Sequence, residues 1–72
     1  MKLKYKYIHF EFLESRNGKG CWVCRNNRSK SELGQVEWYP LWREYVYEPT
    51  VQAVYSISCF EDINNFMRQL PV

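Results

Sequence analysis

The feature that most constrains the fold of this chain is the aromatic-rich stretch of residues 33–48, Leu-Gly-Gln-Val-Glu-Trp-Tyr-Pro-Leu-Trp-Arg-Glu-Tyr-Val-Tyr-Glu. It holds two of the three tryptophans, three of the six tyrosines and a proline at the point where the alternating pattern reverses. Aromatic residues are enriched in strands, and two alternating runs joined by a turn are typical of a β-hairpin. The stretch therefore predicts a hairpin, and with it a sheet.

Within this hairpin we expect Trp38 to face Arg43 across a four-residue connection. Antiparallel pairing then separates an apolar face from an acidic one, and a slip by one residue would exchange the two sets. Gly34 leaves bare backbone over which the ring of Tyr47 can lie. The apolar face is predicted to carry Gly34, Val36, Trp38, Arg43, Tyr45 and Tyr47, and the acidic face Gln35, Glu37, Glu44, Val46 and Glu48.

Alternating apolar residues and turn residues predict three further strands. Ile8, Phe10 and Phe12 alternate with polar residues and are expected to point inward. Asn17-Gly18 favours a turn into the second strand, because this pair tolerates positive φ. After the hairpin, Pro49-Thr50 is expected to turn the chain into a fifth strand. The predicted strands span residues 3–14, 20–26, 33–39, 43–48 and 51–57.

The last segment predicts an amphipathic helix over residues 59–70. Ser58 and Glu61 fit a capping box, and apolar residues recur at spacings of three and four. Together the elements predict one α+β domain over residues 1–72, a five-stranded, mostly antiparallel meander with one C-terminal helix packed on one face. The apolar stripe of the helix is predicted to be Phe60, Ile63, Phe66, Met67 and Leu70.

The cysteine count and the hydropathy pattern bear on the compartment. Three cysteines are an odd number, which argues against a disulfide framework and for a reducing compartment. No apolar run approaches the roughly 20 residues that cross a bilayer. The N-terminus interleaves lysines with apolar residues instead of forming the apolar segment of a signal peptide. We therefore expect a cytoplasmic protein with no membrane partner.

Cys21 and Cys24 have the spacing of redox and zinc sites, but side chains three residues apart in a strand point to opposite faces. A zinc site also needs four ligands, and only Cys59 and His9 remain to supply the others. We therefore predict no metal or other cofactor, and small core roles for Cys24 and Cys59. Because so short a chain leaves little room for a dry pocket, we predict no catalytic residue and no enzymatic activity.

The predicted hairpin tip carries large apolar groups around Pro40, which is unusual unless something covers them. Either the tip folds under the helix, or it anchors another protein, since Trp, Tyr and Arg dominate interface hot spots. The second alternative is our leading hypothesis: a small non-catalytic binding or accessory protein that acts through protein–protein contact. A free sheet edge also leaves a homodimer open. The candidate partner-binding residues are Tyr39, Leu41, Trp42 and Arg43.

Positive charge is concentrated in the first part of the chain. Residues 1–30 carry eight Lys or Arg and two Glu, a balance of +6, whereas residues 31–72 carry two Arg and six acids, a balance of −4. Basic groups near aromatic rings suit nucleic acid, because charge follows phosphates and rings stack on bases. A nucleic-acid-binding module is therefore the alternative function. Its candidate residues in the basic segment 16–30 are Arg16, Lys19, Arg25, Arg28 and Lys30.

The aromatic positions between residues 22 and 70 also form a recognisable pattern. Its most specific part is Trp-Tyr-x-x-Trp-Arg-x-Tyr at residues 38–45. The rest comprises Trp22-Val23, Asn27-Arg28-Ser29, Leu33-Gly34, Val36, Tyr47, Pro49, Tyr55-Ser56, Cys59-Phe60, Asp62-Ile63 and Phe66. The pattern resembles that of a family of small, uncharacterised single-domain proteins from bacterial and bacteriophage genomes. The resemblance implies a compact intracellular accessory protein encoded by a phage or prophage, and it implies no activity, cofactor or catalytic residue.

Overall fold

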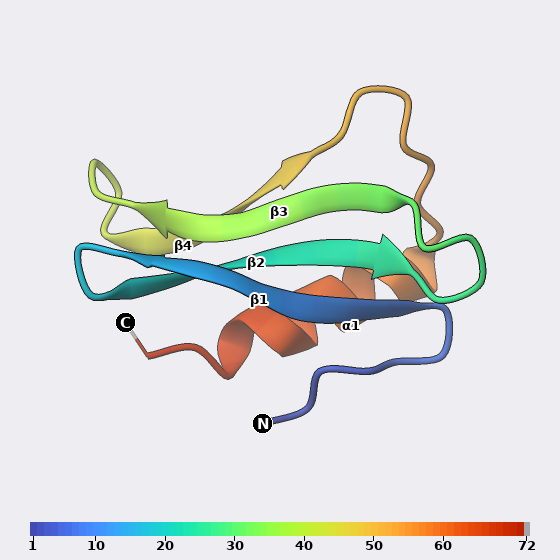
Figure 1. The fold of residues 1–72 in the computed structure, drawn as a ribbon, viewed down its shortest axis with the longest axis horizontal. Helices are drawn as coiled ribbons and strands as arrows, with labels where there is room; N and C mark the ends of the chain where they lie inside the picture. The colour runs from blue at the N-terminus through green and yellow to red at the C-terminus, as the bar shows by residue number, and fades with distance from the viewer. Residues whose placement is uncertain (72) are drawn as a thin grey trace.

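The computed structural model describes residues 1–71 as a four-stranded sheet and one helix. The sheet is an antiparallel meander in the order β1-β2-β3-β4, and α1 covers one of its faces as a second layer (Figure 1). This confirms the α+β fold, the meander and the C-terminal helix, whereas the predicted fifth strand is wrong. The elements are β1 Ile8–Arg16, β2 Lys19–Asn26, β3 Glu32–Tyr39, β4 Glu44–Pro49 and α1 Ile57–Arg68.

Residues 51–57, predicted as a fifth strand, instead form a loop over 51–56 that leaves the sheet, and Ile57 already begins α1. The amide of Thr50 donates to the carbonyl of Leu33 at 2.9 Å, and Gln52 then turns the chain away with φ at 69°. Val51 and Val54 are 86% and 85% exposed, so neither valine is buried against the core. Period-two alternation stabilises a strand only where one face is buried along its length, and in this segment only Ala53 and Tyr55 are partly buried.

Tyr55 fastens this loop to the sheet. Its hydroxyl donates to the carbonyl of Leu33 and lies 3.0 Å from the hydroxyl of Tyr47. The rings of Tyr47 and Tyr55 also meet edge to face, with centroids 5.8 Å apart. These contacts bring the chain from the end of β4 to the start of α1.

The first strand begins at Ile8, five residues later than predicted, because residues 1–7 fold back along it. The amide of Phe10 donates to the carbonyl of Leu3 at 2.8 Å, and Tyr5 and Ile8 form a second backbone bond at 2.8 Å. Tyr5 is buried and meets Phe10 edge to face. At the other end a bulge between Phe12 and Glu14 shifts the register with β2. Phe12 pairs with Trp22 and meets its ring edge to face, so it lies on the predicted face, but it is 60% exposed instead of buried.

The central hairpin keeps its predicted faces in a register displaced by two residues. Trp38 pairs with Tyr45, not with Arg43, and the four-residue connection is Pro40–Arg43. A displacement of two leaves every side chain on its expected face, because side chains alternate with a period of two. The Tyr47 ring does lie over Gly34, where a Cβ would come within 2.5 Å of the tyrosine hydroxyl. Arg43 is the exception, since it belongs to the turn.

The helix begins at Ile57, and its N-cap is Ser56 instead of the predicted Ser58. The Ser56 hydroxyl accepts from the amide of Cys59 at 3.2 Å. Phe60, predicted to be in the apolar stripe, is 58% exposed, and its ring lies against the ring of Tyr55. The inward face of α1 consists of Cys59, Ile63, Phe66 and Met67, and Leu70 continues it just beyond the helix. Ile63, Phe66 and Leu70 are buried.

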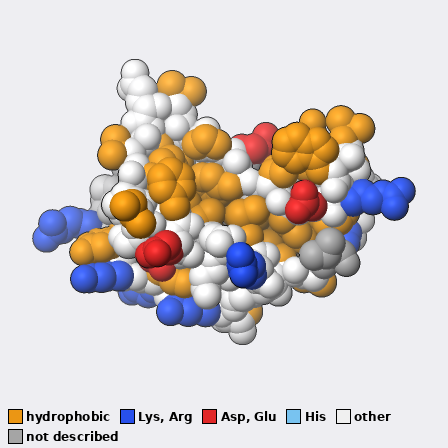
Figure 2. Space-filling model, turned by 180° about the vertical axis from the view of Figure 1, so that it is seen from behind, with side chains coloured by type: hydrophobic (Ala, Val, Ile, Leu, Met, Phe, Trp, Pro, Cys, Tyr) orange, Lys and Arg blue, Asp and Glu red, His pale blue; other side chains and the backbone are white. Residues whose placement is uncertain are grey.

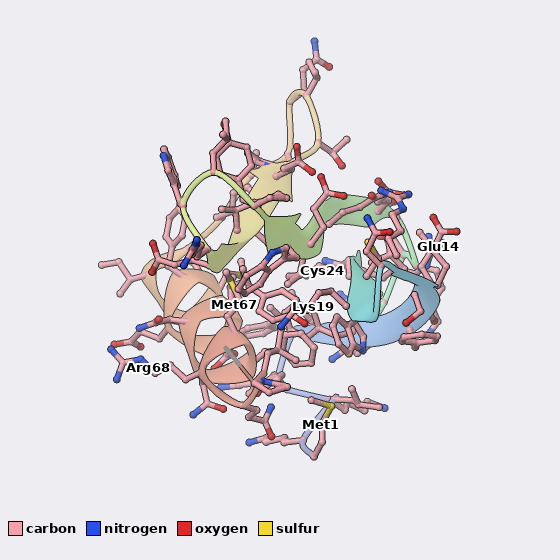
Figure 3. The ribbon with its side chains drawn as sticks, turned by 90° about the vertical axis from the view of Figure 1, so that its left-hand side faces the viewer. Met1, Glu14, Lys19, Cys24, Met67 and Arg68 are labelled. Carbon is pink, nitrogen blue, oxygen red and sulfur yellow. The ribbon has the colours of Figure 1, made fainter. Side chains whose placement is uncertain are left out.

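A stack of two phenylalanines joins the helix to the sheet. Phe66 lies flat on Phe10 of β1, with centroids 3.9 Å apart and planes 3° from parallel, and Trp22 of β2 meets Phe66 edge-on. The helix therefore lies behind β1 and β2, as Figure 1 shows, and leaves β3 and β4 less covered. Viewed along the layers in Figure 3, Cys24 lies between sheet and helix and Arg68 on the outer side of the helix.

The two phenylalanines of α1 give a matched test of this packing. We expect Phe66→Ala to lower the free energy of unfolding by about 3–5 kcal/mol, because it removes a fully buried ring. Phe60→Ala should cost less than about 1 kcal/mol, since that ring is mostly exposed. Urea unfolding followed by tryptophan fluorescence measures both. Equal losses for the two variants would contradict the placement of α1.

Candidate functional site

The hairpin tip is exposed and is not covered by α1, so the alternative in which it folds under the helix is wrong. Leu41 and Trp42 are 82% and 67% exposed. The amide of Arg43 donates to the carbonyl of Tyr39 at 2.9 Å, and the rings of Tyr39 and Trp42 meet edge to face at 4.9 Å. The turn therefore presents Trp42 in a defined position, with the Arg43 side chain exposed beside it.

The sheet surface next to the tip is apolar and only partly covered. Trp38 and Tyr45 are half-buried and in edge-to-face contact at 5.3 Å. A hollow of about 250 Å³ separates β4 from α1 and is lined by Glu44, Tyr45, Asn64, Met67 and Arg68. On this side of the molecule, apolar side chains gather over the upper half, between two projecting corners (Figure 2).

Sequence reasoning missed this uncovered aromatic surface, although the necessary information was present. An α-helix with its side chains is about 10 Å wide, and neighbouring strands lie about 4.8 Å apart. One helix can therefore cover about two strands. A single helix on a four-stranded sheet leaves half of one face to be covered by loops or by another molecule.

Charged side chains of three strands meet on the opposite face of the sheet. The Arg16 guanidinium bridges Glu14 and Glu37, with Nη1 of Arg16 2.9 Å from Oε2 of Glu37. Two effects raise the pKa of the Glu48 carboxyl above its usual value: mainly a hydrogen bond with Glu37 and, less strongly, partial burial. A hollow of about 500 Å³ lies beside this cluster and is lined by Arg16, Asn17, Lys19, Cys21, Glu37, Trp38, Tyr39 and Pro40.

The basic residues predicted to contact nucleic acid do not form one surface. Arg16 ends β1 opposite Lys19 at the start of β2, whereas Arg28 and Lys30 follow the other end of β2, about 23 Å away along the strand. Arg16 is engaged by Glu14 and Glu37, and Arg25 pairs with Glu11 at 3.0 Å. Lys19 lies over the ring of Trp38, with its Nζ 4.2 Å from the centroid. Of the five residues, only Arg28 and Lys30 lie in a loop and form no ion pair with any residue of the described range 1–71.

The cysteine side chains point to opposite faces of the sheet, as their spacing in a strand predicts. Cys24 is fully buried in the core, and desolvation raises its pKa to about 11. Cys21 lies on the other face, 3.8 Å from a carboxylate oxygen of Glu37, and desolvation raises its pKa as well. Both thiols are therefore protonated at neutral pH. Within residues 1–71, no three His, Cys, Asp or Glu side chains are grouped as metal ligands.

The single histidine has a structural role. Nδ1 of His9 lies 2.7 Å from the amide oxygen of Asn27, and Nε2 lies 3.1 Å from a carboxylate oxygen of Glu11. Asn27 in turn donates to the carbonyl of Tyr5 at 2.8 Å. His9 therefore connects β1 to the loop after β2 and to the folded-back N-terminus.

Among residues 1–71, no helix has the length and apolar character needed to span a bilayer.

The Glu37–Glu48 contact predicts a pH-dependent effect on stability. Because the pKa of Glu48 is raised in the folded state, its contribution is favourable below its unfolded pKa and is lost as pH rises. We expect Glu48→Gln to raise the free energy of unfolding at neutral pH by a few tenths of a kcal/mol, with no gain near pH 3, where the wild-type carboxyl is protonated. Urea midpoints at the two pH values measure this, with Glu32→Gln as the control. A destabilised Glu48→Gln protein at neutral pH would contradict the carboxyl contact.

Comparison with protein-family models, with curated proteins and with solved structures found no match for this chain. The resemblance to small bacterial and bacteriophage proteins therefore stays a prediction. The most unusual arrangement in the described residues is the exposed aromatic hairpin tip beside a partly covered aromatic sheet.

Proposed function

We propose that this protein is a non-catalytic binding module that attaches to another protein through the tip of the β3–β4 hairpin. The observation that carries the proposal is the exposure of Leu41 and Trp42 on a hydrogen-bonded turn. An exposed tryptophan held in one position loses little conformational entropy when it is buried by a partner. Arg43 beside it supplies a cationic group that can pair with a carboxylate of that partner.

The surroundings of the tip support the same role. Tryptophan, tyrosine and arginine are the residues that contribute most to binding energy at interfaces, and the tip contains all three. The half-buried Trp38 and Tyr45 continue the apolar surface toward α1. A partner seated on the tip would therefore also cover part of the exposed sheet. If the chain is of phage or prophage origin, the partner is a host or phage protein.

Two exposed apolar pairs of the chain allow a controlled test. We expect Leu41→Ser/Trp42→Ser to abolish capture of a stoichiometric partner by the immobilised domain from bacterial lysate. Val51→Ser/Val54→Ser removes a similarly exposed pair from the 50–56 loop and should leave capture unchanged. Both variants should keep the wild-type free energy of unfolding within about 0.5 kcal/mol, because exposed side chains contribute little to stability. Capture that survives loss of the tip, or is lost equally in the control, would contradict the proposal.

Nucleic-acid binding is a second candidate, and one observation favours it. Lys6, Tyr7 and Arg28 line a hollow of about 420 Å³ with Asn26 and Asn27, so charge and an exposed ring meet at that corner. We expect any binding of labelled single-stranded oligonucleotides to weaken steeply with salt and to fall in Lys6→Ala/Arg28→Ala. Arg43→Ala/Arg68→Ala is the control of equal charge. Fluorescence anisotropy measures this, and no binding at about 50 mM salt removes the candidate.

A further inference from the structure

The two edges of the sheet differ in how they are protected. The edge of β1 is covered at one end by the folded-back N-terminus, through the bond between Phe10 and Leu3, and is bent at the other by the bulge after Phe12. The pairing of β4 with β3 is regular from Glu44 to Pro49. No backbone group of residues 44–48 bonds outside the sheet to residues 1–71. Between Glu44 and Glu48 the edge of β4 is neither covered nor bulged. Pro49, which has no N–H, and the charges of Glu44 and Glu48 also protect this edge, so the positions open to pairing are Tyr45 and Tyr47.

We propose that the outer edge of β4 accepts an extended segment of a partner protein as an added strand. The segment has the pattern basic, apolar, any residue, apolar, basic. It would occupy the place beside β4 that residues 51–57 leave empty when they turn away from the sheet. The inference deepens the proposed function, on which it rests for the idea that the partner is a protein.

The register identifies the backbone groups that would pair with such a segment. Thr50 donates inward to Leu33, and backbone groups alternate in direction along a strand. Val46 and Glu48 therefore also direct their N–H and C=O toward β3. Tyr45 and Tyr47 direct theirs away from the sheet. These four groups can bond to two alternate residues of an antiparallel partner strand.

The side chains of β4 determine the pattern of the segment. The partner residues opposite Tyr45 and Tyr47 lie on the helix side, beside half-buried aromatic rings, where apolar side chains would cover exposed surface. The partner residues opposite Glu44 and Glu48 lie on the other face. No Lys or Arg of residues 1–71 forms an ion pair with either carboxylate. Arg16 acts on Glu48, and Arg68 lines the same hollow as Glu44, but neither forms an ion pair with these carboxylates. Basic side chains of the segment would supply direct ion pairs, and near Glu48 they would also relieve its contact with Glu37.

The same charges disfavour a second copy of this chain as the added strand. Two β4 strands paired antiparallel about Val46 would place Glu44 directly opposite Glu48 at both ends of the pairing. Like charges directly opposite each other destabilise a strand pair. A partner strand with basic residues at those positions has no such conflict, and the charge pattern therefore favours a different protein.

The test uses the end-capped synthetic peptide Ser-Gly-Lys-Val-Thr-Val-Lys-Gly-Ser and the full chain, with binding followed by amide chemical shifts of β4. We expect saturable shifts at Tyr45 and Tyr47. N-methylation of both valines should weaken binding at least about tenfold, because their amides bond to the edge. N-methylation of the threonine should have little effect, since its amide points away from β4. This pair of peptides separates strand addition from nonspecific attraction.

A charge exchange tests the pattern on the protein side. Glu44→Lys/Glu48→Lys should bind the lysine peptide about tenfold more weakly and should prefer the peptide with glutamates in place of both lysines. Glu32→Lys/Glu61→Lys changes net charge equally at two other exposed acids and should keep the original preference. Binding of the glutamate peptide also shows that the exchanged protein is folded.

Several outcomes would overturn the inference. They are no β4 shifts at millimolar peptide, equal binding of the valine-methylated peptide, or equal preference for both peptide charges. Sedimentation that detects a dimer lost on Glu44→Lys/Glu48→Lys would assign the edge to a second copy instead. The peptide assay is repeated with Trp42→Ala, where binding should persist. If the peptide binds to the edge of β4 but the hairpin tip captures no partner, the strand-addition inference is retained. The proposal that the tip binds a partner is then rejected.

Discussion

The stacked rings of Phe10 and Phe66 determine which part of the sheet is covered. The two rings lie 3.9 Å apart and nearly parallel, and Phe66 has no exposed surface. This contact, with Trp22 beside it, centres α1 over β1 and β2. The helix has 12 residues and is therefore about 18 Å long and about 10 Å wide, which is too narrow to reach across four strands. The aromatic side chains of β3 and β4 consequently remain half-exposed.

The two faces of the β3–β4 hairpin were predicted correctly although its register was not, because side chains along a strand alternate with a period of two. The hairpin pairs Trp38 with Tyr45, two residues away from the expected pairing, yet Val36 and Tyr47 stay on the core side. A displacement of one residue would have turned both to the other face. The hydrophobic pattern therefore predicts which face is buried, but the length of the turn decides the register, and Arg43 enters the turn with φ at 54°.

Other features could not be predicted because they depend on contacts between distant residues. The alternation from Val51 to Tyr55 resembles a strand, but the hydroxyl of Tyr55 instead bonds to the carbonyl of Leu33 and holds a loop. The basic segment is continuous in sequence, yet an extended strand separates Arg16 from Arg28, and Glu37 from a third strand neutralises the former. A local stretch of sequence shows which residue types are present. It does not show which distant residues they will contact, because strand pairing determines those contacts.

The exposed tip, the half-covered aromatic surface and the open edge of β4 have one cause. The chain ends its sheet at Pro49, crosses to the helix through the loop held by Tyr55, and then places that helix over the opposite half of the sheet. A fifth strand would have covered the edge, and a helix centred on β3 would have covered the aromatic rings. Because the packing of α1 leaves both exposed on the same side as the hairpin tip, one partner can contact all three. The folded-back N-terminus protects the other edge, so strand addition is directed to β4.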